Sequence, residues 1–483
     1  MTKGGEIILL KSIFFMVTVI IISNFSFEIT YAQQNKQWNI VAIVPDDHSR
    51  RAMGAYGDAQ AVTPNFDRLA EQGVRFNHAY AAAPVCSPSR AAFFSGKYSS
   101  QVGINDFLMR TPYYQQRGLD TQAVLWPEIL KNNGYTTGLI GKWHLGEAPR
   151  FHPKNRGFDY FVGYEQDAKS FDPVLDVNGK IGKIVGHTSN IFVKYAKDFL
   201  QQNKNNKFAL TMTFREPQRP WNAVPKEDLD AVAHIDPVVP DVPGVDQQWL
   251  KKITRDNYAA IHALDRSVGE VLDELDRLGL SENTIVLYVG DHGMLIGHHG
   301  YFGRGAVGVI AGDKVVGDEG IANLYDEAIK IPFIVRWPGQ TGQNKSVDVP
   351  VSNIDVFPTI LSMLGIDVPA GISPEGKDIT MLLKGGKPQI SQPVFAQYNM
   401  ENFGIAHLRM VRFENWKLIK RFNQGAPANL IDQLYNVDDD PGEENNLIEA
   451  TEHQEIRKKL EAMLNVWQHK IKDPVLAQYA HET

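Results

Sequence analysis

Short apolar runs of strand length, rich in β-branched residues, constrain the fold of this chain more than any other feature. Segments with helix-like patterns lie between them, at 63–73, 125–133 and 257–278. This alternation is typical of an α/β fold built on a buried sheet. The runs that we interpret as buried strands are 38–44, 136–140, 208–214 and 284–289.

Polar residues follow two of these predicted strands directly. Asp46 and Asp47 come after the first, and Asp291 and His292 come after the run at 284–289. Open α/β sheets bind ligands at the carboxyl ends of their strands. An isolated Asp-Asp pair is commonly a solvated turn or a helix cap. However, two adjacent carboxylates repel each other unless a cation lies between them, so the pattern also indicates a cation site.

The chain has one cysteine, Cys86, among 483 residues. A single thiol forms no internal disulfide, so this residue serves either packing or reactivity. It lies in the sequence Cys86-Ser87-Pro88-Ser89-Arg90. We expect a helix to begin near Ser89, and the free N–H groups of a helix N-terminus favour an anion such as sulfate.

Lys142 and His144 follow the predicted strand at 136–140, in the sequence Gly-Lys-Trp-His-Leu-Gly at 141–146. Two residues apart in an extended segment, their side chains project to the same side, so both could reach one bound anion. The alternative is a surface lysine beside a packed histidine.

Composition limits the possible partners and the location of the protein. The formal net charge is −7 and no basic run is present, so we expect no nucleic-acid partner. Residues 1–32 have a charged start, a short apolar core and a small residue at Ala32, which predicts a secretory signal peptide. We therefore expect an exported protein, periplasmic or secreted, without a stable membrane anchor.

The pattern Cys86-x-Pro88-x-Arg90 and the sequence at 141–146 together resemble the two signatures of the type I sulfatases, in the alkaline-phosphatase-like superfamily. The similarity extends over nearly the whole chain after the signal peptide and is closest to secreted bacterial polysaccharide sulfatases. It implies a large central mixed sheet flanked by helices in a catalytic domain at 33–372. It also implies a smaller α+β subdomain at 373–483.

The resemblance implies a role for each matching residue. A separate maturation enzyme would oxidise Cys86 to formylglycine (3-oxoalanine), whose hydrated aldehyde is the nucleophile. Arg90 would hold this hydrate in place, Lys142 would bind sulfate, and His144 would hydrogen-bond the hydrate or a sulfate oxygen. A calcium ion would be bound by residue 86 together with Asp46, Asp47, Asp291 and His292, although histidine is not a usual calcium ligand.

Two positions depart from the family pattern. Gln218 stands where many sulfatases have a histidine that protonates the leaving oxygen, and glutamine is no acid. His187 is a candidate substitute at the substrate, and we leave the general acid open. Ile321 stands where a sulfate-binding lysine is usual; we expect Arg304, in preference to Lys314, to supply that charge from a Gly-rich loop at 298–323.

The function that follows is hydrolysis of sulfate esters in a sulfated carbohydrate. Oligosaccharides derived from ulvan are the first choice of substrate and glycosaminoglycans are the second. One alternative is a phosphonate or phosphate monoester hydrolase of the same fold. Another, suggested by Gln218 and Ile321, is a sulfated-glycan binding protein without catalysis.

Overall fold

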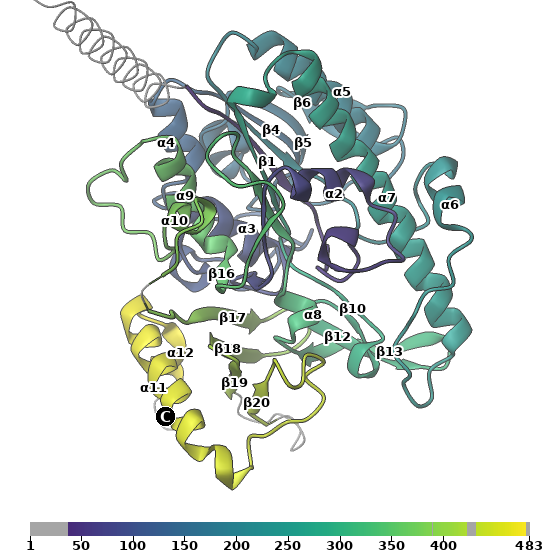
Figure 1. The fold of residues 1–483 in the computed structure, drawn as a ribbon, viewed down its shortest axis with the longest axis vertical. Helices are drawn as coiled ribbons and strands as arrows, with labels where there is room; N and C mark the ends of the chain where they lie inside the picture. The colour runs from purple at the N-terminus through teal and green to yellow at the C-terminus, as the bar shows by residue number, and fades with distance from the viewer. Residues whose placement is uncertain (1–36, 389, 423–430, 480–483) are drawn as a thin grey trace, which may run out of the picture. The chain divides into compact units, whose positions relative to one another are not determined.

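A mixed sheet forms the centre of the fold in this computed structural model, which describes residues 37–388, 390–422 and 431–479. Within that part of the chain the sheet has ten strands, in the order β15-β2-β14-β9-β1-β8-β4-β5-β6-β7 (Figure 1). Five neighbouring strands are parallel: β9 (Thr284–Val289), β1 (Asn39–Val44), β8 (Phe208–Thr213), β4 (Thr136–Lys142) and β5 (Tyr160–Tyr164). This arrangement confirms the predicted α/β class with a large mixed sheet.

The remaining strands of this sheet lie at its two sides. β14 (Phe333–Arg336) pairs antiparallel with β9, and β2 (Val74–Phe76) and β15 (Lys345–Val347) follow it outward. The hairpin of β6 (Val174–Val177) and β7 (Lys180–Lys183) extends the other side. A separate two-stranded pairing joins β3 (Ala79–Tyr80) to β16 (Val351–Ser352).

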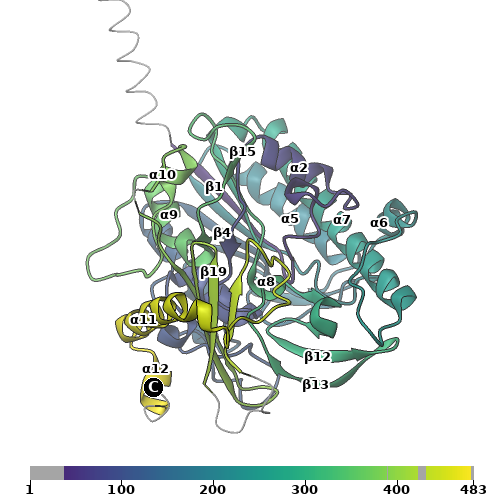
Figure 2. The same ribbon diagram turned by 60° about the horizontal axis from the view of Figure 1, so that its bottom comes forward.

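Helices cover both faces of the central sheet (Figures 1 and 2). One layer contains α2 (Pro64–Glu71), α5 (Thr188–Asn203) and α7 (Gln247–Arg277), which pack on one another. The other contains α3 (Cys86–Ser95), α4 (Trp126–Asn132) and α9 (Val356–Met363). The shorter helices are α6 (Lys226–Val232), α8 (Asp326–Ile329), α10 (Thr380–Leu383) and α12 (Pro474–Gln478).

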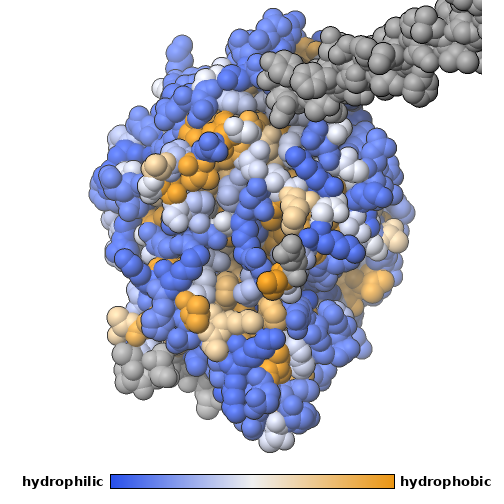
Figure 3. Space-filling model, turned by 60° about the vertical axis from the view of Figure 1, so that its left-hand side comes forward, coloured by the Kyte–Doolittle hydropathy of each residue, from blue (hydrophilic) through white to orange (hydrophobic). Residues whose placement is uncertain are grey.

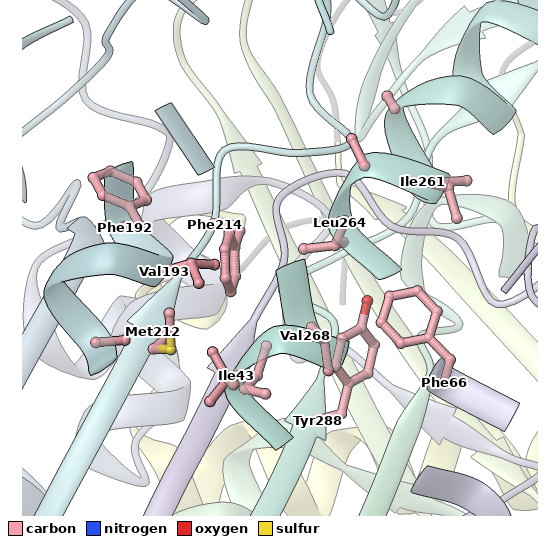
Figure 4. Close-up of a cluster of buried hydrophobic side chains, with 14 of the residues drawn as sticks. Ile43, Phe66, Phe192, Val193, Met212, Phe214, Ile261, Leu264, Val268 and Tyr288 are labelled. Carbon is pink, nitrogen blue, oxygen red and sulfur yellow. The ribbon is translucent and has the colours of Figure 1, made fainter. Parts of the chain in front are cut away.

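The core beneath the first layer shows why these strands are central. Every residue of β1 is buried, and β1, β8 and β9 each contribute side chains to one cluster with α2, α5 and α7. Figure 4 shows Ile43, Met212 and Tyr288 from the three strands facing Leu264 and Val268 of α7. Burial of such side chains contributes about 1.5–3 kcal/mol each, so the packing of this layer on β1, β8 and β9 stabilises the central part of the sheet.

Two predicted helix starts are wrong. Helix α7 begins at Gln247, ten residues before the predicted start at 257, and the Asp246 carboxylate caps it by accepting from the N–H groups of Gln248 and Trp249. The residues of its first turns are largely half-exposed, so the helical spacing of apolar residues, which was the basis of the prediction, begins only near residue 257. Helix α3 begins at Cys86 itself rather than near Ser89.

The predicted loop at 298–323 is also wrong. The segment 295–322 forms an antiparallel sheet of β10 (Leu295–Ile296), β11 (Tyr301–Gly303), β12 (Ala306–Ala311) and β13 (Lys314–Ala322). Its glycines include turn positions: Gly312, with φ 62°, stands in the two-residue turn between β12 and β13. Such turns need a left-handed residue, which glycine adopts without strain.

A second antiparallel sheet lies in the C-terminal part, as predicted. Its strands are β17 (Val394–Met400), β18 (Ala406–Phe413), β19 (Trp416–Phe422) and β20 (Gln433–Asn436), and α11 (Gln454–Ile471) packs on β18 and β19. The division into 33–372 and 373–483 stays a prediction. The predicted signal peptide lies outside the described residues.

The surface is mixed in character. On the face in Figure 3 hydrophilic side chains predominate, and hydrophobic ones form separate patches. Among the helices of the described residues, none is both long enough and apolar enough to cross a membrane.

A fully buried ion pair joins β18 to the end of α11. Arg409 Nε lies 2.6 Å from Asp473 Oδ2, and Arg409 Nη2 lies 2.7 Å from Asp473 Oδ1. Asp473 also accepts from Gln468 Nε2 and caps α12 at the N–H of Val475. Burial would raise the pKa of Asp473, but Arg409 and these donors lower it below its ordinary value.

We expect Asp473→Asn to lower the free energy of unfolding by about 3 kcal/mol, because it leaves Arg409 buried without its counter-charge. Since the folded-state pKa of Asp473 is lowered, its contribution is complete above about pH 4 and is lost on further acidification. The deficit of the variant, measured by urea unfolding, should therefore shrink at low pH. Asp438→Asn, at an exposed carboxylate 3.6 Å from Arg412, is the control and should change little, because water already solvates Asp438. An equal deficit in both variants would contradict this account.

Candidate active site

Cys86 lies at the centre of a buried group of charged side chains. Its Sγ is 3.3 Å from Asp46 Oδ1, 3.3 Å from His292 Nε2 and 3.7 Å from Arg304 Nη1. The thiol has no exposed surface. We call the following set the Cys86 centre: Asp46, Asp47, Cys86, Arg90, Lys142, Asp291, His292 and Arg304.

The strand order explains why these residues meet. Asp46 and Asp47 directly follow the end of β1, and Asp291 and His292 follow its neighbour β9. Lys142 is the last residue of β4, which is separated from β1 only by β8. Parallel strands end at the same edge of a sheet, so these side chains converge there.

Each carboxylate of the Cys86 centre contacts a permanent cation. Lys142 Nζ lies 2.5 Å from Asp46 Oδ2, and Arg90 Nη2 donates to Asp291 Oδ2 at 2.9 Å. Arg304 holds Asp47 through two atoms, with Nε 2.7 Å from Oδ1 and Nη2 2.9 Å from Oδ2. Burying charges of one sign is strongly unfavourable without partners of the other sign, so the site needs these cations in order to fold.

These cations change the acidity of the groups that they surround. Burial would raise the pKa of Asp46, but Lys142, Arg90 and Arg304 together lower it well below the ordinary value. Burial and then the charge of Asp46 would raise the pKa of the Cys86 thiol, yet Lys142, Arg304 and His292 lower it. The centre therefore favours a negative charge on the side chain at position 86.

The donor set of the centre fits a hard divalent cation. One ligand atom from each of Asp46, Cys86, Asp291 and His292 lies within 4.8 Å of the others, and all four residues are buried. Oxygen ligands suit calcium, and Asp47 adds a further carboxylate, with Oδ1 3.5 Å from His292 Nε2. The same three carboxylates contact Arg90, Lys142 and Arg304, so their charge is partly offset by the protein itself.

Comparison with known proteins identifies the fold and the family together. The sulfatase family model matches residues 38–366, and the model for the C-terminal region of N-sulphoglucosamine sulphohydrolase matches residues 321–470. The chain belongs to the sulfatase family. It is therefore a sulfuric ester hydrolase by family.

Two relatives of this sulfatase are similar over most of its length. An ulvan-active sulfatase of Formosa agariphila is 30% identical, covering 88% of this chain and 80% of the relative. An N-acetylglucosamine-6-O-sulfatase of Bacteroides thetaiotaomicron is 25% identical, covering 91% and 88%. A solved structure in complex with its substrate D-glucosamine-2-N,6-O-disulfate has a TM-score of 0.77 at 23% identity, covering 91% of this chain and 99% of that chain. This last likeness shows a shared fold.

His144 departs from the geometry that we predicted. Its φ is 60°, so the chain turns into the left-handed region there and the segment is not extended beside Lys142. Its Nε2 lies 2.8 Å from the Leu108 carbonyl, and Nδ1 is buried without a hydrogen-bond partner among the described residues. Burial, with the charge of Lys142, lowers the pKa of His144 well below its usual range, so the neutral ring donates through Nε2. Its catalytic role stays a prediction.

The two substitute positions lie at different places. Arg304, in the turn between β11 and β12, reaches the Cys86 centre, whereas Ile321 of β13 pairs with Val307 of β12. His187 Nε2 lies 3.2 Å from Glu216 Oε1, and its ring packs on Phe171. None of the contacts described for His187 or Gln218 is with Cys86, and their roles stay predictions.

Sequence reasoning missed the support behind Cys86. The Ser89 hydroxyl donates to the backbone carbonyl of Asp291 and accepts from Asn353 Nδ2 at 2.7 Å. These bonds fix the first turn of α3 against the end of β9. Ser89 is three residues after Cys86 on the same helix face, and this spacing was the signal available in the sequence.

A cleft of about 1470 Å³ opens beside β5 and the hairpin of β6 and β7. Its lining carries both signs of charge and includes aromatic side chains. Among the lining residues are Arg110, Tyr164, Lys169, Phe171, Lys183 and Arg215. A cleft of this volume can hold more than one sugar unit.

We expect Arg304→Met to lower kcat for sulfate ester hydrolysis about 100-fold, because Asp47 loses both of its close donors from the Arg304 guanidinium. Lys314→Met removes a lysine from the far end of β13 and should leave kcat unchanged. Steady-state rates of sulfate release, with thermal unfolding to verify folding, make the comparison. A larger loss of kcat in the Lys314 variant than in the Arg304 variant would show that Lys314, and not Arg304, supplies the sulfate-binding charge.

Proposed function

We propose that this sulfatase removes sulfate from a sulfated carbohydrate, with oligosaccharides derived from ulvan as the first choice. The observation that carries the reaction is the burial of Cys86 among three carboxylates and three cations. The similarity to the ulvan-active sulfatase, which spans most of both chains, supports the choice of substrate. The open cleft along β5 supports an oligosaccharide rather than a small ester.

We propose that the side chain at position 86 acts as formylglycine and that Asp46, Asp47 and Asp291 bind calcium, with His292 beside them. The hydrate of formylglycine supplies the nucleophile, and calcium supplies a Lewis acid for the sulfate oxygens. The other side chains of the centre bind and orient the sulfate group.

The chain's own residues bind and orient the sulfate group. Lys142 and Arg304 face position 86 from two sides, so they offset charge on the sulfuryl oxygens as the S–O bond breaks. Arg90 donates to the Lys142 carbonyl at 3.1 Å as well as to Asp291, and this ties α3 to the ends of β4 and β9. Because every residue of the centre except the half-buried Arg304 is buried, water weakens these interactions little.

The first test is sulfate release from ulvan, carrageenan, fucoidan and heparan oligosaccharides by protein co-produced with a formylglycine-generating enzyme. We expect release from one class, with ulvan favoured, and at least about 1,000-fold slower release by Cys86→Ala, which lacks the nucleophile. Ion chromatography measures free sulfate.

The outcomes separate the alternatives. No release from any glycan, by protein whose peptide at position 86 carries the aldehyde by mass, would reject the carbohydrate proposal. Faster turnover of phosphonate esters would then favour the phosphonate hydrolase. Glycan binding that is unaffected by Cys86→Ala, without any release, would favour a binding protein.

We also expect Asp291→Ala to weaken calcium binding on the order of 100-fold, since it removes one carboxylate of the centre. Isothermal titration of chelator-treated protein measures this directly and needs no turnover. Asp348→Ala, at an exposed carboxylate, is the matched control. Equal affinities in the two variants would reject the calcium site.

A further inference from the structure

Tyr164 is a buried hydroxyl group at the edge of the Cys86 centre that the reaction described so far does not use. It is the last residue of β5 and lies in register with Lys142 on β4. Its side chain lines the 1470 Å³ cleft, yet the residue is only 5% exposed. Its hydroxyl has no hydrogen-bond partner among the described residues.

The position of this hydroxyl is fixed by its surroundings. The Tyr164 carbonyl accepts from the N–H of Trp143 at 2.9 Å, and the ring stacks on Phe192 with centroids 6.3 Å apart. The charges of Asp46 and Arg90 act on the phenol from the Cys86 centre, and Arg215 acts from the cleft. Tyr164 therefore stands between the cleft that it lines and Lys142, its neighbour in register.

Burial of an unpaired hydroxyl is unfavourable, so a partner is expected when the site is filled. Burial raises the pKa of Tyr164 well above its ordinary value, so the group keeps its proton and acts as a donor. Gln218 cannot act as an acid, so the position where many sulfatases have a histidine supplies no proton here.

We propose that the Tyr164 hydroxyl donates a hydrogen bond to the bridging oxygen of the sulfate ester, the atom that departs with the sugar. This inference rests on the proposed sulfatase reaction. A hydroxyl oxygen of the hydrate at position 86 would form the new bond to sulfur while the bond from sulfur to the bridging oxygen breaks. The electron pair of the broken bond stays on the bridging oxygen, and the hydrogen bond stabilises the charge that develops there. The proton stays on Tyr164, and the leaving oxygen gains the proton that the attacking hydroxyl gives up.

The test is how Tyr164→Phe depends on the leaving group. A sugar alkoxide is strongly basic and needs a donor, whereas 4-nitrophenolate spreads its charge over its own ring. We expect the variant to lower kcat about 100-fold for the sugar sulfate, and less than about 3-fold for 4-nitrophenyl sulfate. Equal losses for both substrates, or no loss for either, would overturn the proposal.

A second measurement applies to whichever ester the enzyme cleaves. With the donor removed, more negative charge stays on the bridging oxygen, so the kinetic isotope effect of ¹⁸O at that atom should increase in Tyr164→Phe. An unchanged isotope effect contradicts the proposal even if the rate falls. Wild-type protein without activity on any ester would instead reject the proposed function, so the two failures are distinguishable.

Two control variants separate Tyr164 from its neighbours. Tyr160→Phe makes the same change at the start of β5, away from the residues that line the cleft, and should show no leaving-group dependence. Gln218→Leu tests whether the glutamine amide is the donor. If the dependence appears in the Gln218 variant and not in Tyr164→Phe, the assignment to Tyr164 is wrong.

Discussion

The mutual neutralisation of buried charges around Cys86 is the interaction on which the rest of the structure depends. Asp46, Asp47 and Asp291 lie within a few ångströms of one another, without water to screen them. Lys142, Arg90 and Arg304 contact them and offset their charge. The parallel strand order brings most of these groups to one sheet edge, and the β11–β12 turn adds Arg304. Folding therefore supplies the free energy needed to position these groups, and they are in place before a substrate binds.

Sequence reasoning worked where a single local signal determined the outcome. The β-branched runs predicted the central strands, and residues directly after a buried strand must lie at the sheet edge, so Asp46, Asp47 and Asp291 were identifiable. It failed where distant packing decided the local structure. The first turns of α7 are polar and show no helical spacing of apolar residues, so the sequence pattern did not reveal them. The glycines at 298–323 lie in hairpins, and the pairing of those strands cannot be read from the local sequence.

The family departures show why a side chain's place in the sequence and its place in the site differ. Ile321 occupies the expected position of a cation, yet it faces Val307 across a strand pair. Arg304 precedes it by seventeen residues, but the turn between β11 and β12 brings its guanidinium to Asp47. A cationic side chain at more than one position of such a hairpin can therefore reach the Cys86 centre. The sequence named Arg304 as a candidate, but only the strand pairing explains how it reaches the centre.

One of the connections between the C-terminal sheet and the chemistry is the loop that contains Asp106 and Leu108. Leu108 donates its N–H to the Ser87 hydroxyl, and its carbonyl lies 2.8 Å from His144 Nε2, so this loop orients His144 beside Lys142. The same loop is held from the other side, because Asp106 accepts from the N–H groups of Glu401 and Asn402 in the turn after β17. The ring of His144 is therefore positioned by residues nearly 260 positions away. A change in the turn after β17 can therefore reach His144 without touching any residue of the Cys86 centre.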